Sequence, residues 1–178
     1  MSQRAKLGKL EIDLQELAEF IAEAKRNTYA GDGHEERVVD DSRILVYQKG
    51  DFHYTDNYDG HFQAGGNEIV RWQNQDGQRI WYMSYLGGMK GEFFIDDGLV
   101  EKVFDFLKKV LKQVTPQMPF RGPGYFIEDG LLYISRTDGD IRRFSGKEQI
   151  FQTSDSGTSL YLPELFSYDY IGGLFIPK

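Results

Sequence analysis

The second half of this 178-residue chain repeats the first half. Gly66-Asn67-Glu68 reappears as Gly146-Lys147-Glu148, an offset of 80 residues. Upstream the offset is 79, and downstream it is 85. Small changes of offset between matched segments are typical of loop insertions, because surface loops tolerate changes of length that strands do not. The other matched segments are Tyr54 with Tyr133, Asp59-Gly60 with Asp138-Gly139, and Tyr85-Leu86-Gly87-Gly88 with Tyr170-Ile171-Gly172-Gly173.

Two helices are predicted, one near the start of each half. Leu14, Leu17 and Ile21 recur at helical spacing after Asp13, a residue typical of the N-cap, so we expect a helix that ends near Arg26 or Asn27. A broader apolar stripe runs from Leu99 to Val114 behind Asp96 or Asp97, and Pro116 is expected to close that helix. The reversal after the first helix is predicted at Gly31 and Gly33.

Each helix is followed by segments with the alternation and the turn residues of antiparallel hairpins. Asp-Gly dipeptides and other short turns connect them, and these connections are too short for a crossover helix. The predicted strands are 43–47, 52–56, 68–72 and 79–85, then 125–128, 131–135, 141–144, 149–153, 159–162 and 168–171.

The fold class predicted is therefore α+β, with two sequence-related halves of one helix and about four antiparallel strands each. The halves would span about residues 13–91 and 96–178 of a single domain. We expect two related sheets, with helices on one face of each, meeting about a pseudo-twofold axis. A cleft between the halves would be the natural ligand site.

Composition narrows the function. The chain has no cysteine, which excludes disulfides, thiol nucleophiles and Cys-ligated zinc. A formal net charge of −7 leaves no global basic footprint, so nucleic-acid binding is not expected. No apolar run approaches the length of a transmembrane helix, and no signal peptide is apparent, so we expect a soluble, cytoplasmic protein.

Three motifs of the chain are distinctive: Glu23-Ala24-Lys25 with Thr28-Tyr29-Ala30-Gly31, Trp81-x-Met83-x-Tyr85-x-Gly87, and Pro119-x-Arg121-Gly122-Pro123. They resemble motifs of a bacterial domain of unknown function, and the resemblance extends from Leu14 to Ile176. It implies a domain that occurs alone or behind a helix-turn-helix DNA-binding segment, where it would sense a small molecule. No such segment is expected here before the first helix. The usual His before the terminal Gly pair is Ile171, which weakens a catalytic role there.

Arg121 is the most distinctive candidate for a site. It lies in a segment stiffened by Pro119 and Pro123, and a guanidinium suits a carboxylate or a phosphate. It could clamp an anionic ligand, or it could form a salt bridge to Glu68 or Asp56. Ligand-binding residues predicted with it are Tyr29, Tyr58, Trp81 and Glu68.

Glu68 and Glu148 hold equivalent places in the repeat, and two interpretations stay open. As a carboxylate pair they could act as acid and base; as Gly-x-Glu devices at strand starts they could accept backbone N–H groups of a turn. The structural interpretation is favoured, because catalytic residues usually diverge between repeats. Core filling is likewise the favoured interpretation for Trp81.

No metal or other cofactor is predicted. The spacing of His53, Asp56, Asp59 and His61 matches no familiar metal site. His53 and Asp56 would also project to opposite faces of one strand. We therefore expect a domain that binds a small polar or anionic ligand. The alternatives are an enzyme with Glu68 as general base and Arg121 as electrostatic stabiliser, or an interaction module that forms a homodimer.

Overall fold

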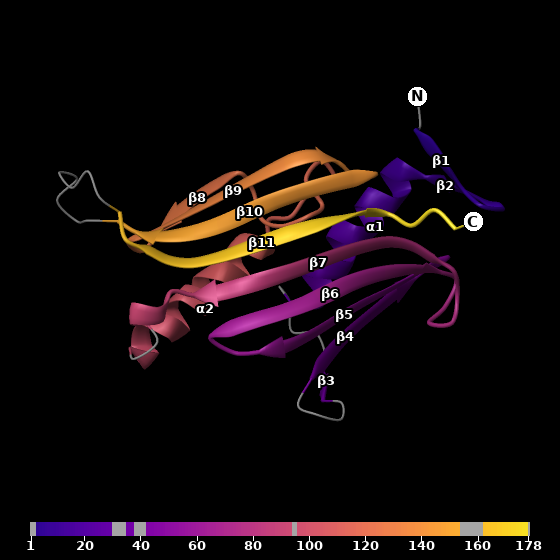
Figure 1. The fold of residues 1–178 in the computed structure, drawn as a ribbon. Coiled ribbons are helices and arrows are strands. Elements are labelled where there is room, and N and C mark those ends of the chain that lie inside the picture. Colours follow the sequence, from indigo (N-terminus) through magenta and orange to yellow (C-terminus); the bar gives the residue numbers. More distant parts are fainter. Residues whose placement is uncertain (1–2, 30–34, 38–41, 94–95, 154–161, 178) are drawn as a thin grey trace.

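The computed structural model describes residues 3–29, 35–37, 42–93, 96–153 and 162–177. Within these ranges the chain forms two α-helices, a two-stranded hairpin and one nine-stranded antiparallel sheet (Figure 1). The α+β class is confirmed. Three features of the sequence analysis lie outside the described residues. They are the predicted reversal at Gly31 and Gly33, the histidine His34, and the predicted strand 159–162 except for its last residue.

The sheet is continuous, which corrects the expectation of two separate sheets. Its order is β3-β4-β5-β6-β7-β11-β10-β9-β8. Strands β7 and β11 pair antiparallel from Met89↔Phe166 to Trp81↔Leu174, and this pairing joins the strands that follow each helix. The bounds are β3 Glu35–Arg37, β4 Arg43–Lys49, β5 Phe52–Gly60, β6 Gln63–Trp72, β7 Arg79–Met89, β8 Tyr125–Glu128, β9 Leu131–Asp140, β10 Arg143–Gln152 and β11 Glu164–Leu174.

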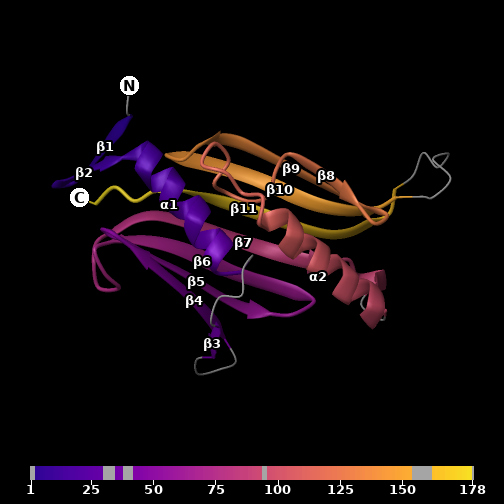
Figure 2. The same ribbon diagram turned by 180° about the vertical axis from the view of Figure 1, so that it is seen from behind.

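Both helices lie on the same face of this sheet (Figure 2). Helix α1 (Leu14–Asn27) has Asp13 as its N-cap, with the Asp13 carboxylate accepting from the backbone N–H groups of Gln15 and Glu16. Helix α2 (Asp97–Leu111) begins after Asp96, which caps Leu99 N–H. Both predicted N-caps are confirmed. Helix α2 ends before Pro116, because the chain already turns between Lys112 and Val114.

The core lies between the helices and the side chains that alternate toward them from the strands. Leu17 and Ile21 of α1 and Val103 and Leu107 of α2 are fully buried there. Aromatic side chains fill the sheet side of this layer, so that the two helices and the strands of both halves share one core. These aromatic residues include Tyr54, Trp81, Tyr133, Phe144 and Phe166.

Two features differ from the predicted elements. A hairpin of β1 (Arg4–Leu7) and β2 (Leu10–Asp13) precedes α1, where only charged sequence was apparent. The predicted strands 141–144 and 149–153 are one strand, β10, because Gly146 does not interrupt it. A Cβ on Gly146 would lie 2.4 Å from the Tyr170 ring, so the ring of the neighbouring strand occupies the place of the missing side chain.

Neither helix combines the length and the apolar sequence that a bilayer-spanning helix requires, and the rest of the described chain contains no such helix.

Candidate functional site

A cavity of about 460 Å³ lies between the sheet and helix α2, beside the C-terminal end of α1. Its floor is formed by side chains of β5, β6 and β7, together with Tyr168 of β11 and Arg121. One wall comes from α2. The cavity is thus bounded by strands of the first half and the helix of the second half. The α2 residues that line it are Asp97, Val100, Glu101, Phe104, Asp105, Lys108 and Leu111.

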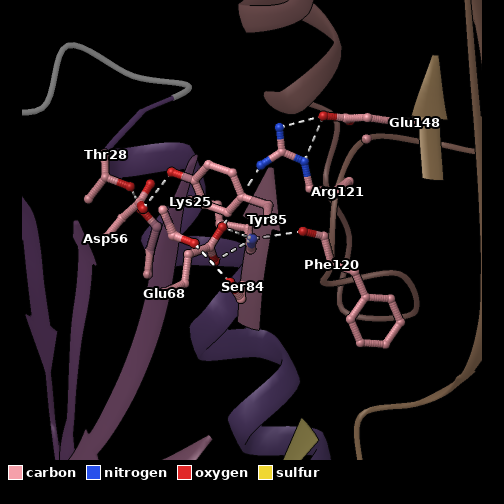
Figure 3. A network of polar contacts seen from close by, with 12 residues as sticks. Lys25, Thr28, Asp56, Glu68, Ser84, Tyr85, Phe120, Arg121 and Glu148 are labelled. Atoms are coloured by element: carbon pink, nitrogen blue, oxygen red, sulfur yellow. Dashed lines mark hydrogen bonds and ion pairs between the residues drawn. The ribbon is translucent and has the colours of Figure 1, made fainter. Parts of the chain in front are cut away.

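Lys25 and Glu68 form a buried ion pair in the floor (Figure 3). Lys25 Nζ donates to Glu68 Oε1 at 2.7 Å and to the Phe120 carbonyl at 2.7 Å. Lys25 follows Ile21 by one helical turn, so the apolar stripe of α1 carries it inward. Burial lowers the pKa of Lys25, and the charge of Glu68 opposes that shift. Lys25 therefore fixes α1 to β6 and to the loop before Arg121.

Arg121 is held by Glu148 of β10, and both residues belong to the second half. Arg121 Nε and Nη2 donate to Glu148 Oε1 at 3.0 and 2.6 Å, and the Tyr133 hydroxyl donates to Glu148 Oε2 at 2.6 Å. Arg121 Nη1 lies 3.9 Å from Glu68 Oε1. The guanidinium also stacks over the rings of Tyr85 and Tyr168, with centroid distances of 5.4 and 5.5 Å. Arg121 thus lies between the carboxylates of β6 and β10.

Asp56 is the third carboxyl group of the floor, and it differs from the other two. It is 4% exposed, it pairs in register with Glu68 across β5 and β6, and its Oδ1 accepts from the Tyr85 hydroxyl at 2.9 Å. None of the ion pairs among the described residues includes Asp56. Burial and the charge of Glu68 raise the pKa of Asp56 to about 7, against the opposing effects of Tyr85, Lys25 and Arg121.

The upper part of the cavity is largely aromatic. Tyr29 and Tyr58 meet edge to face at a centroid distance of 6.2 Å, and His61 stacks on Phe104 at 5.8 Å. Phe62 lines the same region. This wall offers apolar and aromatic surface, whereas the floor offers hydrogen-bonding groups.

The structure brings four of the five predicted site residues to this cavity: Arg121, Tyr29, Tyr58 and Glu68. Trp81 does not line it. Trp81 is fully buried in the hydrophobic core and stacks on Phe144, with ring centroids 5.8 Å apart. Its position agrees with the favoured interpretation of Trp81 as a core residue.

The favoured interpretation of the Gly-x-Glu segments needs correction. Glu68 and Glu148 lie within strands rather than at strand starts, and their carboxylates bind Lys25, Arg121 and Tyr133 rather than the backbone of a turn. The salt bridge considered for Arg121 is present, with Glu148 as its main partner and with a cavity beside it.

Lys25, Asp56 and Tyr85 were absent from the predicted site, although two signals pointed to them. Lys25 interrupts the apolar stripe of α1, and Asp56 alternates with Tyr54 and Tyr58 on the inner face of β5. Within the described ranges, no three His, Asp or Glu side chains are placed to hold a metal ion.

The fold and the site together define an α+β domain in which helices cover a polar-floored cavity on one face of an antiparallel sheet. Residues 56–174 match the family described as a domain of unknown function, DUF5680, and the chain belongs to that family. No curated protein matches the chain, and no solved structure does.

Proposed function

We propose that this domain binds a small molecule in the cavity between the sheet and α2. The observation that carries the proposal is a cavity of about 460 Å³ with aromatic walls and a buried polar floor. Ligand pockets typically enclose about 300–1,000 Å³ and combine apolar walls with a few converging polar groups. Arg121 and Glu68 would contribute to the floor, and Tyr29 and Tyr58 to the wall.

The charges of the cavity favour a polar ligand that is neutral or basic over an anionic one. Lys25 is engaged by Glu68, and Arg121 by Glu148. Five carboxyl groups but four Lys or Arg side chains line the cavity, and Glu148 lies directly behind it. An anion would therefore have to compete with carboxylates that are already paired to the buried cations.

The test is a fragment screen by ligand-observed NMR that compares the wild type with Ala64→Phe. Ala64 lines the cavity from β6, so the added ring would fill it. Ser145→Phe adds the same ring to an exposed position and is the matched control. We expect fragments that bind the wild type and the control but not the filled variant. Fragments that bind all three proteins equally would contradict the proposal.

The second candidate function is an enzyme. In this enzyme Asp56, rather than Glu68, would be the general acid or base. Glu68 is tied to Lys25, whereas Asp56 has a pKa raised to about 7 and faces the cavity, which suits a general acid or base. Arg121 would stabilise developing negative charge nearby. In an enzyme, Asp56→Asn should abolish turnover of a bound compound while leaving its binding measurable.

A third candidate, an interaction module, rests on the uncovered face of the sheet. Leu86 of β7 and Ile171 of β11 are 68% and 58% exposed on these adjacent strands. A homodimer through this face would show a mass that rises with concentration in light scattering, and Leu86→Lys would abolish that rise.

We also propose that the two halves derive from one duplicated unit. The strand order supports this, because β4 to β7 and β8 to β11 run inward in mirrored order to the central β7–β11 pair. Tyr54 and Tyr133 lie opposite Val70 and Ile150, each two residues beyond a Glu of the neighbouring strand.

A further inference from the structure

The floor of the cavity holds one more negative group than it holds cations. Asp56, Glu68 and Glu148 are each at most 4% exposed. The two cations buried among them are Lys25 and Arg121. Lys25 donates to Glu68 and to a backbone carbonyl, and Arg121 donates to Glu148. Without a further positive charge, one of the three carboxyl groups must hold a proton, because an uncompensated buried charge is very costly.

Among the residues that the structure describes, no cation forms an ion pair with Asp56. Asp56 accepts a hydrogen bond from a neutral hydroxyl, that of Tyr85, and it lies directly opposite Glu68 on the neighbouring strand. Two carboxyl groups in register across antiparallel strands cannot both ionise cheaply. Asp56 also lines the cavity, so a bound molecule can reach it. The place of its missing counterion is thus the cavity itself.

We propose that the natural ligand is a small amphipathic amine, and that its ammonium group pairs with Asp56 in place of the proton that this carboxyl group otherwise holds. This inference rests on the proposed function, since it names the chemical class of the molecule in the cavity.

The surroundings of Asp56 contain both signs of charge, and their balance favours such a ligand. The charged or titratable groups packed around it are Lys25 of α1, Tyr54 of β5, Glu68 of β6, Tyr85 of β7, and Arg121. Glu68 adds negative potential, whereas the two cations are drawn toward carboxylates of their own. The acidic side chains of α2 that line the cavity outnumber its one lysine there, Lys108, and would attract a cation: Asp97, Glu101 and Asp105.

The apolar part of the amine has a defined place as well. Tyr58, Phe62 and Phe104 line the wall above the floor, and the ring faces can accept apolar contact or part of the ammonium charge. An aryl-alkyl amine would thus place its ring against the wall and its nitrogen toward β5.

Proton exchange gives the proposal a measurable signature. Because the amine replaces a proton, the proton competes with it below the pKa of Asp56, which burial and Glu68 raise to about 7. Binding should therefore be about tenfold tighter at about pH 8 than at about pH 6, with up to one proton released per amine bound. A neutral ligand would show neither effect.

The experiment compares three probes of similar size: 2-phenylethylamine, 2-phenylethanol and 3-phenylpropanoate. Each is titrated by ligand-observed NMR at both pH values, and the amine also by calorimetry in two buffers of different ionisation enthalpy, which counts protons. We expect the amine to bind best. Asp56→Asn should remove both its advantage over the alcohol and its pH dependence. Asp59→Asn, an exposed change on the same strand, should preserve both.

The outcomes separate the inference from the function on which it rests. If the alcohol or the carboxylate binds at least as tightly as the amine at about pH 8, the cavity binds ligands but the amine proposal is overturned. A pH dependence that survives in Asp56→Asn also overturns it. If none of the probes binds at millimolar concentration, or if Ala64→Phe leaves all binding unchanged, the proposed function fails with it.

Discussion

Arg121 and Glu148 form a fully buried ion pair in which Nε and Nη2 of the guanidinium converge on one carboxylate oxygen, at 3.0 and 2.6 Å. Arg121 lies in the loop after α2, and Glu148 lies in the middle of β10. The second oxygen of Glu148 accepts from Tyr133. The pair therefore fixes the loop that bounds the cavity to the strands of the second half.

Removing one partner of this pair should be strongly destabilising. Arg121→Met leaves Glu148 buried without a counterion, and such changes typically cost about 3–5 kcal/mol of unfolding free energy. The combination Arg121→Met, Glu148→Met and Tyr133→Phe removes all three polar groups and should recover most of that loss. Urea unfolding measures both. Arg142→Met is the control, because its pair with Asp140 is solvent-exposed and should leave the unfolding midpoint nearly unchanged.

The elevated pKa of Asp56 makes stability depend on pH in a defined direction. Between about pH 4 and about pH 7 the unfolded chain has lost this proton while the folded chain retains it, so the contribution of Asp56 to stability falls as pH rises through this window. A shift from 3.8 to about 7 corresponds to roughly 4 kcal/mol. Below this window the contribution is constant, because both states are protonated.

Asp56→Asn isolates that contribution. The advantage of the variant over the wild type should grow from about pH 4 to about pH 7 and then level off, as measured by urea unfolding at several pH values. Asp59→Asn, on the same strand but exposed, should show no such trend. A stability difference between Asp56→Asn and the wild type that stays constant from about pH 5 to about pH 8 would argue against a proton held by Asp56.

The sequence was sufficient to predict both helices and most of the strands, because their signals are local, although it did not predict the β1–β2 hairpin. The stripe of Leu14, Leu17 and Ile21 and the cap at Asp13 define α1 to within a residue, and the Asp129-Gly130 turn correctly separates β8 from β9. Pairing between distant strands has no such signal. The pairing of β7 with β11 decides whether the strands form one sheet or two. It is made by the backbone groups of two strands that would each be an exposed sheet edge if the halves were apart.

The site was predictable only in part, for a related reason. Arg121 and Glu68 were recognisable as charges in distinctive segments, yet their partners come from elements far away in the chain. In the sequence, Lys25 belonged only to a motif near the end of the predicted helix, because its partners, Glu68 and the Phe120 carbonyl, lie far away in the chain. The cavity itself arises from the way α2 crosses the strands of the first half, which no periodicity in the sequence indicates.

Gly66 should be intolerant of even a methyl group. A Cβ there would lie 2.7 Å from the Tyr85 hydroxyl and 2.6 Å from the Asn57 carbonyl. Gly66→Ala should therefore displace Tyr85, break its hydrogen bond to Asp56, and cost about 1–3 kcal/mol by overpacking. Gly124→Ala is the control, because its nearest neighbour would be 3.8 Å away. Thermal unfolding with amine binding as a second readout would compare them, and equal stability of the two variants would exclude a packing role for Gly66.

Trp81 gives the test that separates a core residue from a ligand-binding one. Trp81 is fully buried and stacks on Phe144. The ring centroid of Phe144 lies 4.0 Å from that of Phe120, the residue before Arg121. Trp81→Phe should lower the unfolding free energy, by less than the roughly 3–5 kcal/mol that loss of a whole buried aromatic side chain costs. It should leave the affinity for 2-phenylethylamine unchanged, whereas Ala64→Phe should abolish binding with the fold intact. If Trp81→Phe instead weakened binding without a change in stability, Trp81 would belong to the site and the cavity would extend deeper than its lining indicates.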